Sequence, residues 1–151
     1  MFFIVFLCAN CQSKQLKSPK CGEGELIIPD GTTKIEDREY YNCSDYNGSL
    51  IIPDSVTEIG EEAFSGCTGI FGSLTLSASL KIIGKRAFYR CNFNSELIIP
   101  SNTESIGELA FYQCKHLEGS LIIPNSVKEI GPNAFNLCSG MNGKLTLSNL
   151  E

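Results

Sequence analysis

The chain is 151 residues long, the length of a single domain. Its formal net charge of -5 at pH 7 argues against nucleic-acid binding, which needs a basic patch. Hydrophobic residues make up 42% of the chain and charged residues 19%, a folded rather than a disordered composition. No segment reaches the ~18 consecutive apolar residues of a membrane span, so we expect no transmembrane anchor.

The first eleven residues form an apolar leader. The run from Phe2 to Ala9 has the length of a signal-peptide core, and Ala9 and Cys11 are small enough to precede a cleavage site after Cys11. No basic residue precedes the run, and the leader is short for a signal. Residues 1–11 are therefore either a signal peptide or an apolar segment that folds over the next part of the chain.

After an N-terminal segment at residues 12–25, the sequence repeats with a regular period. A period between 20 and 50 residues indicates a solenoid, a propeller or an array, and a short unit rich in Leu and Ile favours a leucine-rich repeat solenoid. We predict this solenoid over residues 26–151, as five repeats and a truncated sixth. The repeats begin at Leu26, Leu50, Leu74, Leu97, Leu121 and Leu145. All steps between them are equal except the third, which is one residue shorter.

Residues 48–71 illustrate the local structure that we expect of one repeat. Side chains alternate across a strand, so Leu50 and Ile52 are expected to point inward and Ile51 outward. Pro53 cannot donate a hydrogen bond and ends the pairing. The stretch "EEAF" at 61–64 predicts a short helical or 3-10 turn. The prediction is thus of right-handed coils, with one parallel sheet of five or six short strands on the concave face and helical turns on the other side.

An aromatic residue and a cysteine recur at the same interval. The aromatic residues are expected to stack inside the solenoid as a ladder. Free cysteine packs like a small hydrophobic residue, so we expect buried free thiols, with disulfides between adjacent coils as the alternative. The aromatic slots hold Tyr40, Phe64, Phe88, Phe111 and Phe135, and the cysteine slots hold Cys43, Cys67, Cys91, Cys114 and Cys138. Cys21 is a candidate for an earlier member of the cysteine series.

The sequence contains no recognisable catalytic motif. His116 is the only histidine, and no P-loop, nucleophile elbow or HExxH pattern occurs. Cys8 and Cys11 have the spacing of half a zinc site, but no second pair follows. We therefore predict no enzyme, no metal site and no cofactor. Asn42 and Asn47 begin Asn-x-Ser triplets and are candidate N-glycosylation sites if the chain is exported.

The units "LIIPDSVTEIGEEAFSGCTGI" and "LIIPNSVKEIGPNAFNLCSGM" resemble the BspA-like leucine-rich repeat over residues 26–150. The resemblance implies a secreted or cell-surface protein that mediates adhesion to host cells, host matrix proteins or other microbes. It also implies no catalytic residues. We expect a non-enzymatic protein-binding module, with an intracellular, cytoplasmic scaffold as the alternative.

The outward strand positions form the predicted protein-binding surface, which we call the stripe. A solenoid uses its extended concave surface for binding, and a row of exposed isoleucines would make an apolar patch there. The alternative is that Ile and Thr are simply good strand formers. The stripe consists of Ile27, Ile51, Thr75, Ile98, Ile122 and Thr146. The row beside it consists of Glu25, Ser49, Ser73, Glu96, Ser120 and Lys144.

The sixth repeat stops just after its strand, with Leu145 and Leu147 at inward positions. A solenoid edge without a polar cap exposes apolar surface. We therefore expect end-to-end self-association through this coil.

Overall fold

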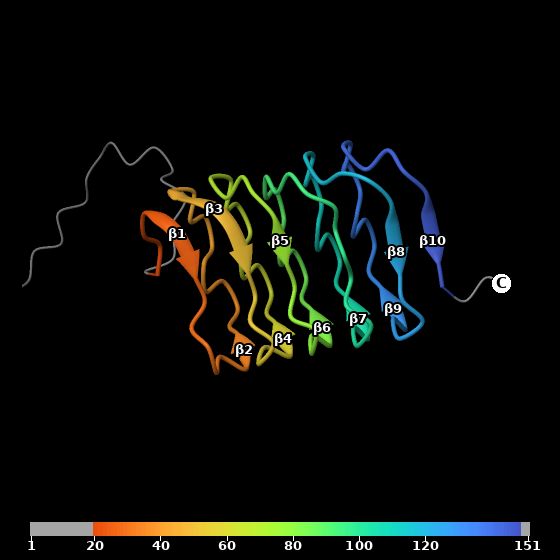
Figure 1. Ribbon diagram of the computed structural model, residues 1–151, viewed down its shortest axis with the longest axis horizontal. Coiled ribbons are helices and arrows are strands. Elements are labelled where there is room, and N and C mark those ends of the chain that lie inside the picture. Colours follow the sequence, from red (N-terminus) through yellow and green to blue (C-terminus); the bar gives the residue numbers. More distant parts are fainter. Residues whose placement is uncertain (1–19, 149–151) are drawn as a thin grey trace, which may run out of the picture.

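The computed structural model describes residues 20–148, and these residues form a parallel β-solenoid (Figure 1). Most coils contribute to one row of strands at the leucine slots and to a second row at an isoleucine that follows each leucine at a fixed interval. These isoleucines are Ile35, Ile59, Ile83, Ile106 and Ile130. No helix occurs within residues 20–148. The prediction of a repeat solenoid is confirmed, whereas the leader at 1–11 and residues 12–19 lie outside the described residues.

The strands at the leucine slots make two separate sheets. The first has the order β1 (Gly24–Ile27), β3 (Tyr46–Ile51) and β5 (Leu74–Thr75). The second pairs β8 (Leu121–Ile123) with β10 (Leu145–Leu147). Every pair is parallel and joins neighbouring coils, and none of these pairs involves coil four, which begins at Leu97. The prediction of one sheet of five or six strands is wrong in this respect, because residues 97–99 form no strand.

The second row is a continuous five-stranded parallel sheet that the sequence did not predict. Its order is β2 (Lys34–Ile35), β4 (Glu58–Ile59), β6 (Ile82–Ile83), β7 (Ser105–Ile106) and β9 (Glu129–Ile130). Each isoleucine of this row pairs with that of the next coil, as Ile59 does with Ile83. Strands of two residues are too short to show an alternating pattern in the sequence.

The third side of each coil is built from turns where a short helical or 3-10 turn was expected. Glu62 has φ 53°, and its N–H donates to the carbonyl of Lys85 in the next coil at 2.8 Å. The N–H of Phe64 donates to the carbonyl of Ala87 at 2.8 Å. A helix would keep these hydrogen bonds within its own segment. Hydrogen bonding between coils therefore replaces the helix on this side.

The glycine of each IG pair is required by close stacking of the backbones. A Cβ atom on Gly84 would lie 2.6 Å from the backbone of Gly60 in the preceding coil. The same atom on Gly107 would lie 2.5 Å from the backbone nitrogen of Lys85. Neither contact is tolerable, so any other residue at this slot would push the coils apart.

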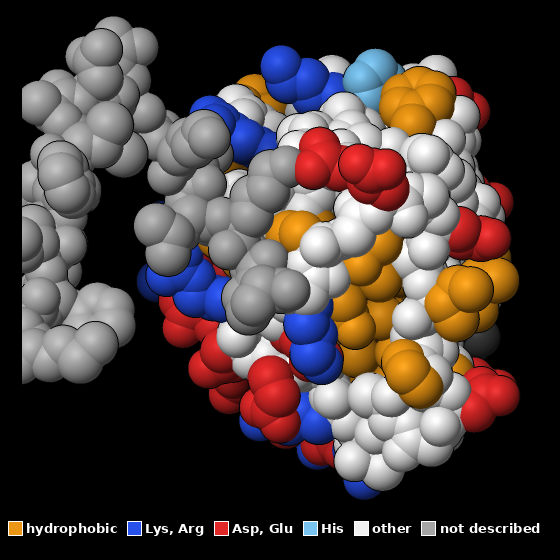
Figure 2. All heavy atoms as spheres, turned by 90° about the vertical axis from the view of Figure 1, so that its left-hand side faces the viewer, with side chains coloured by type: hydrophobic (Ala, Val, Ile, Leu, Met, Phe, Trp, Pro, Cys, Tyr) orange, Lys and Arg blue, Asp and Glu red, His pale blue; other side chains and the backbone are white. Residues whose placement is uncertain are grey.

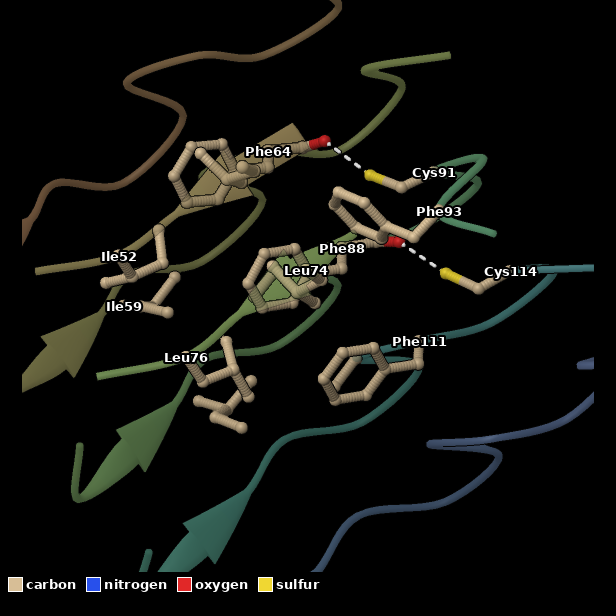
Figure 3. Packing of buried hydrophobic residues seen from close by; sticks show 14 of the residues in the cluster. Ile52, Ile59, Phe64, Leu74, Leu76, Phe88, Cys91, Phe93, Phe111 and Cys114 are labelled. Atoms are coloured by element: carbon tan, nitrogen blue, oxygen red, sulfur yellow. Dashed lines mark hydrogen bonds between the residues drawn. The ribbon is translucent and has the colours of Figure 1, made fainter. Parts of the chain in front are cut away.

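The core confirms the aromatic ladder, and Tyr40 forms its first ring. Tyr40 stacks on Phe64 with ring centroids 5.2 Å apart. The next three centroid distances are 5.4, 5.1 and 5.5 Å, which carries the stack to Phe135. Phe93 meets Phe88 edge-on at 5.9 Å (Figure 3). One column of rings thus holds successive coils together along the solenoid.

Four cysteines of the series, Cys67, Cys91, Cys114 and Cys138, are buried free thiols, as predicted. Each thiol donates to the carbonyl of a ladder aromatic in the preceding coil, as Cys91 does to Phe64 at 3.1 Å and Cys114 to Phe88 at 3.0 Å (Figure 3). Burial raises the pKa of Cys67 to about 12 and that of Cys138 to about 11. Because the thiolate is the reactive form, these thiols are chemically inert in the folded protein.

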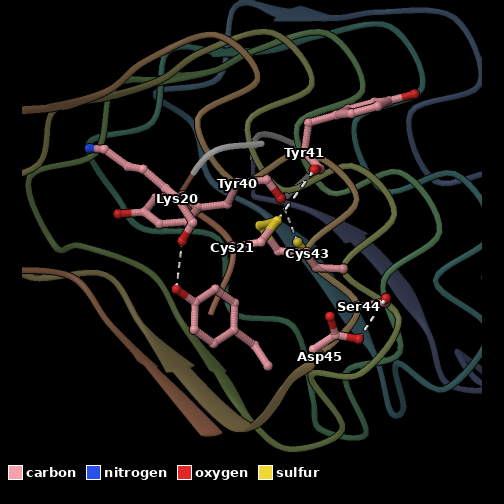
Figure 4. Close-up of a disulfide and its surroundings, with 9 residues drawn as sticks. Lys20, Cys21, Tyr40, Tyr41, Cys43, Ser44 and Asp45 are labelled. Carbon is pink, nitrogen blue, oxygen red and sulfur yellow. Dashed lines mark hydrogen bonds between the residues drawn. A yellow bond between two sulfur atoms is a disulfide. The ribbon is translucent and has the colours of Figure 1, made fainter. Parts of the chain in front are cut away.

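Cys43 departs from the prediction, because it forms a disulfide with Cys21 (Figure 4). The two Cα atoms lie 4.9 Å apart, within the range that a disulfide spans. Cys21 is therefore the partner of Cys43 across adjacent coils. The disulfide holds residues 20–22 against the first coil, where Lys20 pairs with Glu39 and lies 5.8 Å from the centre of the Tyr40 ring. This segment covers the first ring of the aromatic ladder.

Candidate functional site

The structure places the predicted stripe at the surface. The exposed fractions of its isoleucines are 75% for Ile27, 58% for Ile51, 71% for Ile98 and 55% for Ile122. Thr75 is exposed and Thr146 is half-buried. Ile27 pairs with Ile51, Ile51 with Thr75, and Ile122 with Thr146, so these positions lie side by side across the coils. The alternation of side chains along each strand thus places an apolar row on the solvent-exposed face of the strands at the leucine slots.

The polar row beside the stripe is partly tied to the backbone. The backbone N–H and the hydroxyl of Ser73 each lie 3.0 Å from the Ser49 hydroxyl. The N–H of Lys144 donates to the Ser120 hydroxyl at 3.0 Å. These serines therefore cap the starts of neighbouring strands. Glu96 remains exposed at the rim of the stripe.

The row of strands beneath the stripe is interrupted at coil four, and sequence reasoning missed this feature. The segment from Cys91 to Leu97 is one residue shorter than the matching segment from Cys67 to Leu74. Phe93 fills the core there and is fully buried. Among the described residues, the one isolated β-bridge outside the named strands joins coil four to coil five, between Glu96 and Glu118. The sequence feature that could have predicted this interruption is the step from Leu74 to Leu97, which is one residue shorter than the other steps between repeats.

Two pockets flank Ile98 where the sheet is interrupted. The first has a volume of ≈ 270 Å³ and lies toward coil three, against Thr75 and Ala78. The second has a volume of ≈ 190 Å³ and lies toward coil five, against Ile122. Ser101 lines both pockets. The apolar face is therefore hollowed on both sides of one isoleucine.

The outer wall, by which we mean the surface formed by the second strand row and the turns that follow it, carries ion pairs between neighbouring coils. Lys34 lies 3.0 Å from Glu58, and Lys128 lies 2.8 Å from Glu104. The hydrogen bond from Lys128 lowers the pKa of Glu104, and the same bond raises the pKa of Lys128. Figure 2, a view along the stack, shows acidic and basic side chains mixed on one flank of the body, and apolar side chains with acidic ones beside them on the opposite edge. The outer wall is therefore of mixed charge and not an apolar contact surface.

The two candidate glycosylation sites differ in access. The amide nitrogen of Asn42 is buried without a hydrogen-bond partner, and a Cβ atom on Gly66 would lie 2.1 Å from its side-chain oxygen. Asn47 lies in β3 and is exposed. Since a glycan is attached at the amide nitrogen, Asn47 is the site that the folded chain leaves accessible.

Residues 20–148 contain no group of three or more His, Cys, Asp or Glu side chains placed to hold a metal ion. His116 is exposed and meets the Phe71 ring edge-on at 5.3 Å, in the loops. Over the same residues, no helix has the length and apolar character needed to span a membrane. The most distinctive surface on this part of the chain is therefore the stripe with its two pockets.

Comparison with known proteins places these features in a family. The model of the BspA type leucine rich repeat region matches residues 19–142 with 6 copies. A leucine rich cell surface protein from Faecalibacterium prausnitzii is similar in structure, with a TM-score of 0.69 and 32% identity over 81% of this chain and 31% of that one. No curated protein matches the chain.

Two further solved structures are similar. The T. pallidum leucine rich repeat protein has a TM-score of 0.59 and 29% identity, over 74% of this chain and 51% of that one. A leucine-rich repeat protein from Bacteroides ovatus has a TM-score of 0.57 and 28% identity, over 77% of this chain and 35% of that one. The chain thus spans between 31% and 51% of the length of these three relatives. With six matched copies of the repeat unit and the solenoid that they build, the chain belongs to the BspA type leucine rich repeat family.

Proposed function

We propose that this chain is a non-enzymatic protein-binding module and that the stripe is its contact surface. The observation that carries the proposal is the row of four isoleucines, each more than half exposed, on one face of the solenoid. Large apolar patches on a soluble protein mark interaction sites. A serine or lysine at these positions would cost an exposed strand little, so strand formation alone does not account for the row.

The disulfide supports export over the intracellular scaffold. Disulfides persist in oxidising compartments and are rare in the cytosol, and Cys21 and Cys43 form one. The four free thiols fit either compartment because they are buried. The name of the Faecalibacterium relative, a cell surface protein, points the same way. We propose a secreted or cell-surface location and adhesion to host or matrix proteins.

The experiment compares two double variants in binding to a panel of immobilised matrix proteins and to host-cell surfaces. Ile98→Ser with Ile122→Ser removes the centre of the stripe, and Glu61→Ser with Glu108→Ser alters the outer wall. Both pairs replace side chains outside the buried core, so both variants should stay folded by circular dichroism. The stripe variant should lose binding and the outer-wall variant should keep it. The reverse pattern would place the contact surface on the outer wall.

A second candidate role is end-to-end self-association. In the last described coils Ile130, Leu137, Leu145 and Leu147 are 42–63% exposed. The strands β9 and β10 stand at the edges of their sheets, where unpaired backbone groups favour pairing with another chain. Sedimentation velocity on the purified chain tests this role: a dimer that Leu145→Lys dissociates supports it, and a concentration-independent monomer refutes it.

A further inference from the structure

Among the residues that the structure describes, coil four leaves backbone polar groups unpaired at the centre of the stripe. Leu97 and Ile99 are buried, as the inward residues of other coils are, yet residues 97–99 form no strand (Figure 1). Within residues 20–148, the N–H groups of Ile98 and Ile99 donate no hydrogen bond, and their carbonyls accept none. Backbone polar groups in a sheet are normally paired. Coil four therefore has both backbone donors and backbone acceptors without partners in this part of the chain, next to the exposed side chain of Ile98.

The two pockets beside Ile98 add apolar volume to these polar groups. Their volumes of ≈ 270 and ≈ 190 Å³ are several times the ~30 Å³ that a water molecule occupies in the liquid, so each has room for a branched aliphatic side chain. Their shared wall is Ile98, and Ser101 lies at the edge of both. A ligand that fills both pockets must cross coil four.

We propose that coil four binds an extended polypeptide segment with two aliphatic side chains two residues apart, one in each pocket. This inference rests on the proposed function and names the chemistry of the partner. Side chains two residues apart on one face of an extended chain are about 6.7 Å apart. Paired coils are about 4.8 Å apart, so the segment crosses the coil obliquely. The peptide backbone supplies the donors and acceptors that the open groups need, which an acyl chain lacks.

Charge at the rim adds a preference for basic residues. Glu96 lines the second pocket, and the bridge to Glu118 brings a second carboxylate beside it. Both residues are exposed. A Lys or Arg next to the aliphatic pair would face these carboxylates, and opposite charges across an interface set orientation and partner choice. The segment that fits coil four is therefore an aliphatic-x-aliphatic sequence flanked by a basic residue.

The test is selection of displayed random linear peptides on the full chain, followed by affinity measurement on two matched variants. Ser101→Phe fills both pockets without touching the core, and Asn125→Phe places the same ring at the equivalent position of coil five. We expect enriched peptides to carry the aliphatic-x-aliphatic pair with a flanking Lys or Arg. Their affinity should fall at least 10-fold for Ser101→Phe and stay unchanged for Asn125→Phe.

A second variant tests the backbone part of the inference. Replacing residues 92–95 by "KHLEG", residues 115–119 of the next coil, restores the spacing found in the other coils and keeps Glu96. This variant should protect the amide of Ile99 from hydrogen exchange and abolish peptide binding. The inference is overturned if no such peptide is enriched, if Ser101→Phe binds the enriched peptides equally well, or if laurate occupies the pockets and peptides do not. If Ser101→Phe keeps adhesion while Ile98→Ser with Ile122→Ser loses it, the pocket inference fails and the proposed function stands.

Discussion

Truncating the central ring of the aromatic ladder should be among the most destabilising single changes in this chain. Phe88 is fully buried, stacks on Phe64 at 5.4 Å and on Phe111 at 5.1 Å, and meets Phe93 edge-on at 5.9 Å. Replacing a buried Phe by Ala costs about 3–5 kcal/mol, and aromatic pairs add about 0.5–1.5 kcal/mol each beyond burial.

The upper end of that range applies to Phe88→Ala, because the surrounding structure cannot collapse onto the cavity. The N–H of Phe88 donates to Ala110 at 2.8 Å, and its carbonyl accepts from Cys91 and Cys114, so the backbone is held on both sides. We expect a loss of about 5 kcal/mol in the free energy of unfolding. With a urea m-value of about 2 kcal/mol/M, the midpoint should fall by about 2.5 M.

Phe135→Ala is the matched control, because Phe135 is only partly buried and has one stacking neighbour, Phe111, at 5.5 Å. We expect it to cost about 2 kcal/mol, below the range for a fully buried Phe, because part of the Phe135 ring is already in contact with solvent. Urea unfolding followed by circular dichroism measures both variants. Equal losses for the two variants would refute the view that the ladder holds the coils together.

The thiols, the disulfide and the ion pairs each give a further prediction. The four free cysteines of the series should react with a thiol reagent only after unfolding, since burial raises their pKa; an equal labelling stoichiometry of native and denatured protein would contradict this. Replacing Cys21 and Cys43 by Ser should lower the free energy of unfolding by about 3 kcal/mol, because the disulfide closes a loop across a separation of 22 residues; an unchanged urea midpoint would count against the disulfide. Glu104→Gln should reduce stability slightly near pH 7 and have no effect at low pH. The pKa of Glu104 is lowered in the folded chain, so its contribution is complete above the ordinary value of 4.5 and is lost as the pH falls through the folded value. If urea titrations at pH 2 still show a difference in the free energy of unfolding between Glu104→Gln and the parent chain, the ion pair with Lys128 is not the cause of the lost stability.

The sequence by itself determined the repeat and the direction of most side chains. The regular interval shows which residues occupy equivalent slots, and the period of two in a strand separates Leu50 and Ile52, which are buried, from Ile51, which is exposed. The ladder rings and the inward cysteines follow from the same interval. These features are local to one coil and recur, so they can be read without knowing how the coils pack.

Only the tertiary structure decided the features that depend on contacts between coils. The second sheet arises from two-residue strands whose pairing partners lie one whole coil away, and the turns around Glu62 replace a helix because their N–H groups bond to the next coil. Cys43 differs from Cys67 only because Cys21 lies within disulfide distance of it. The break in the strand row at Ile98 coincides with a segment before Leu97 that is one residue shorter than in the other coils. The hydrogen bonds lost there depend on how the chain around the buried Phe93 packs against the neighbouring coils. Local patterns do not encode these distances, because each is set by the stacking of one coil on another.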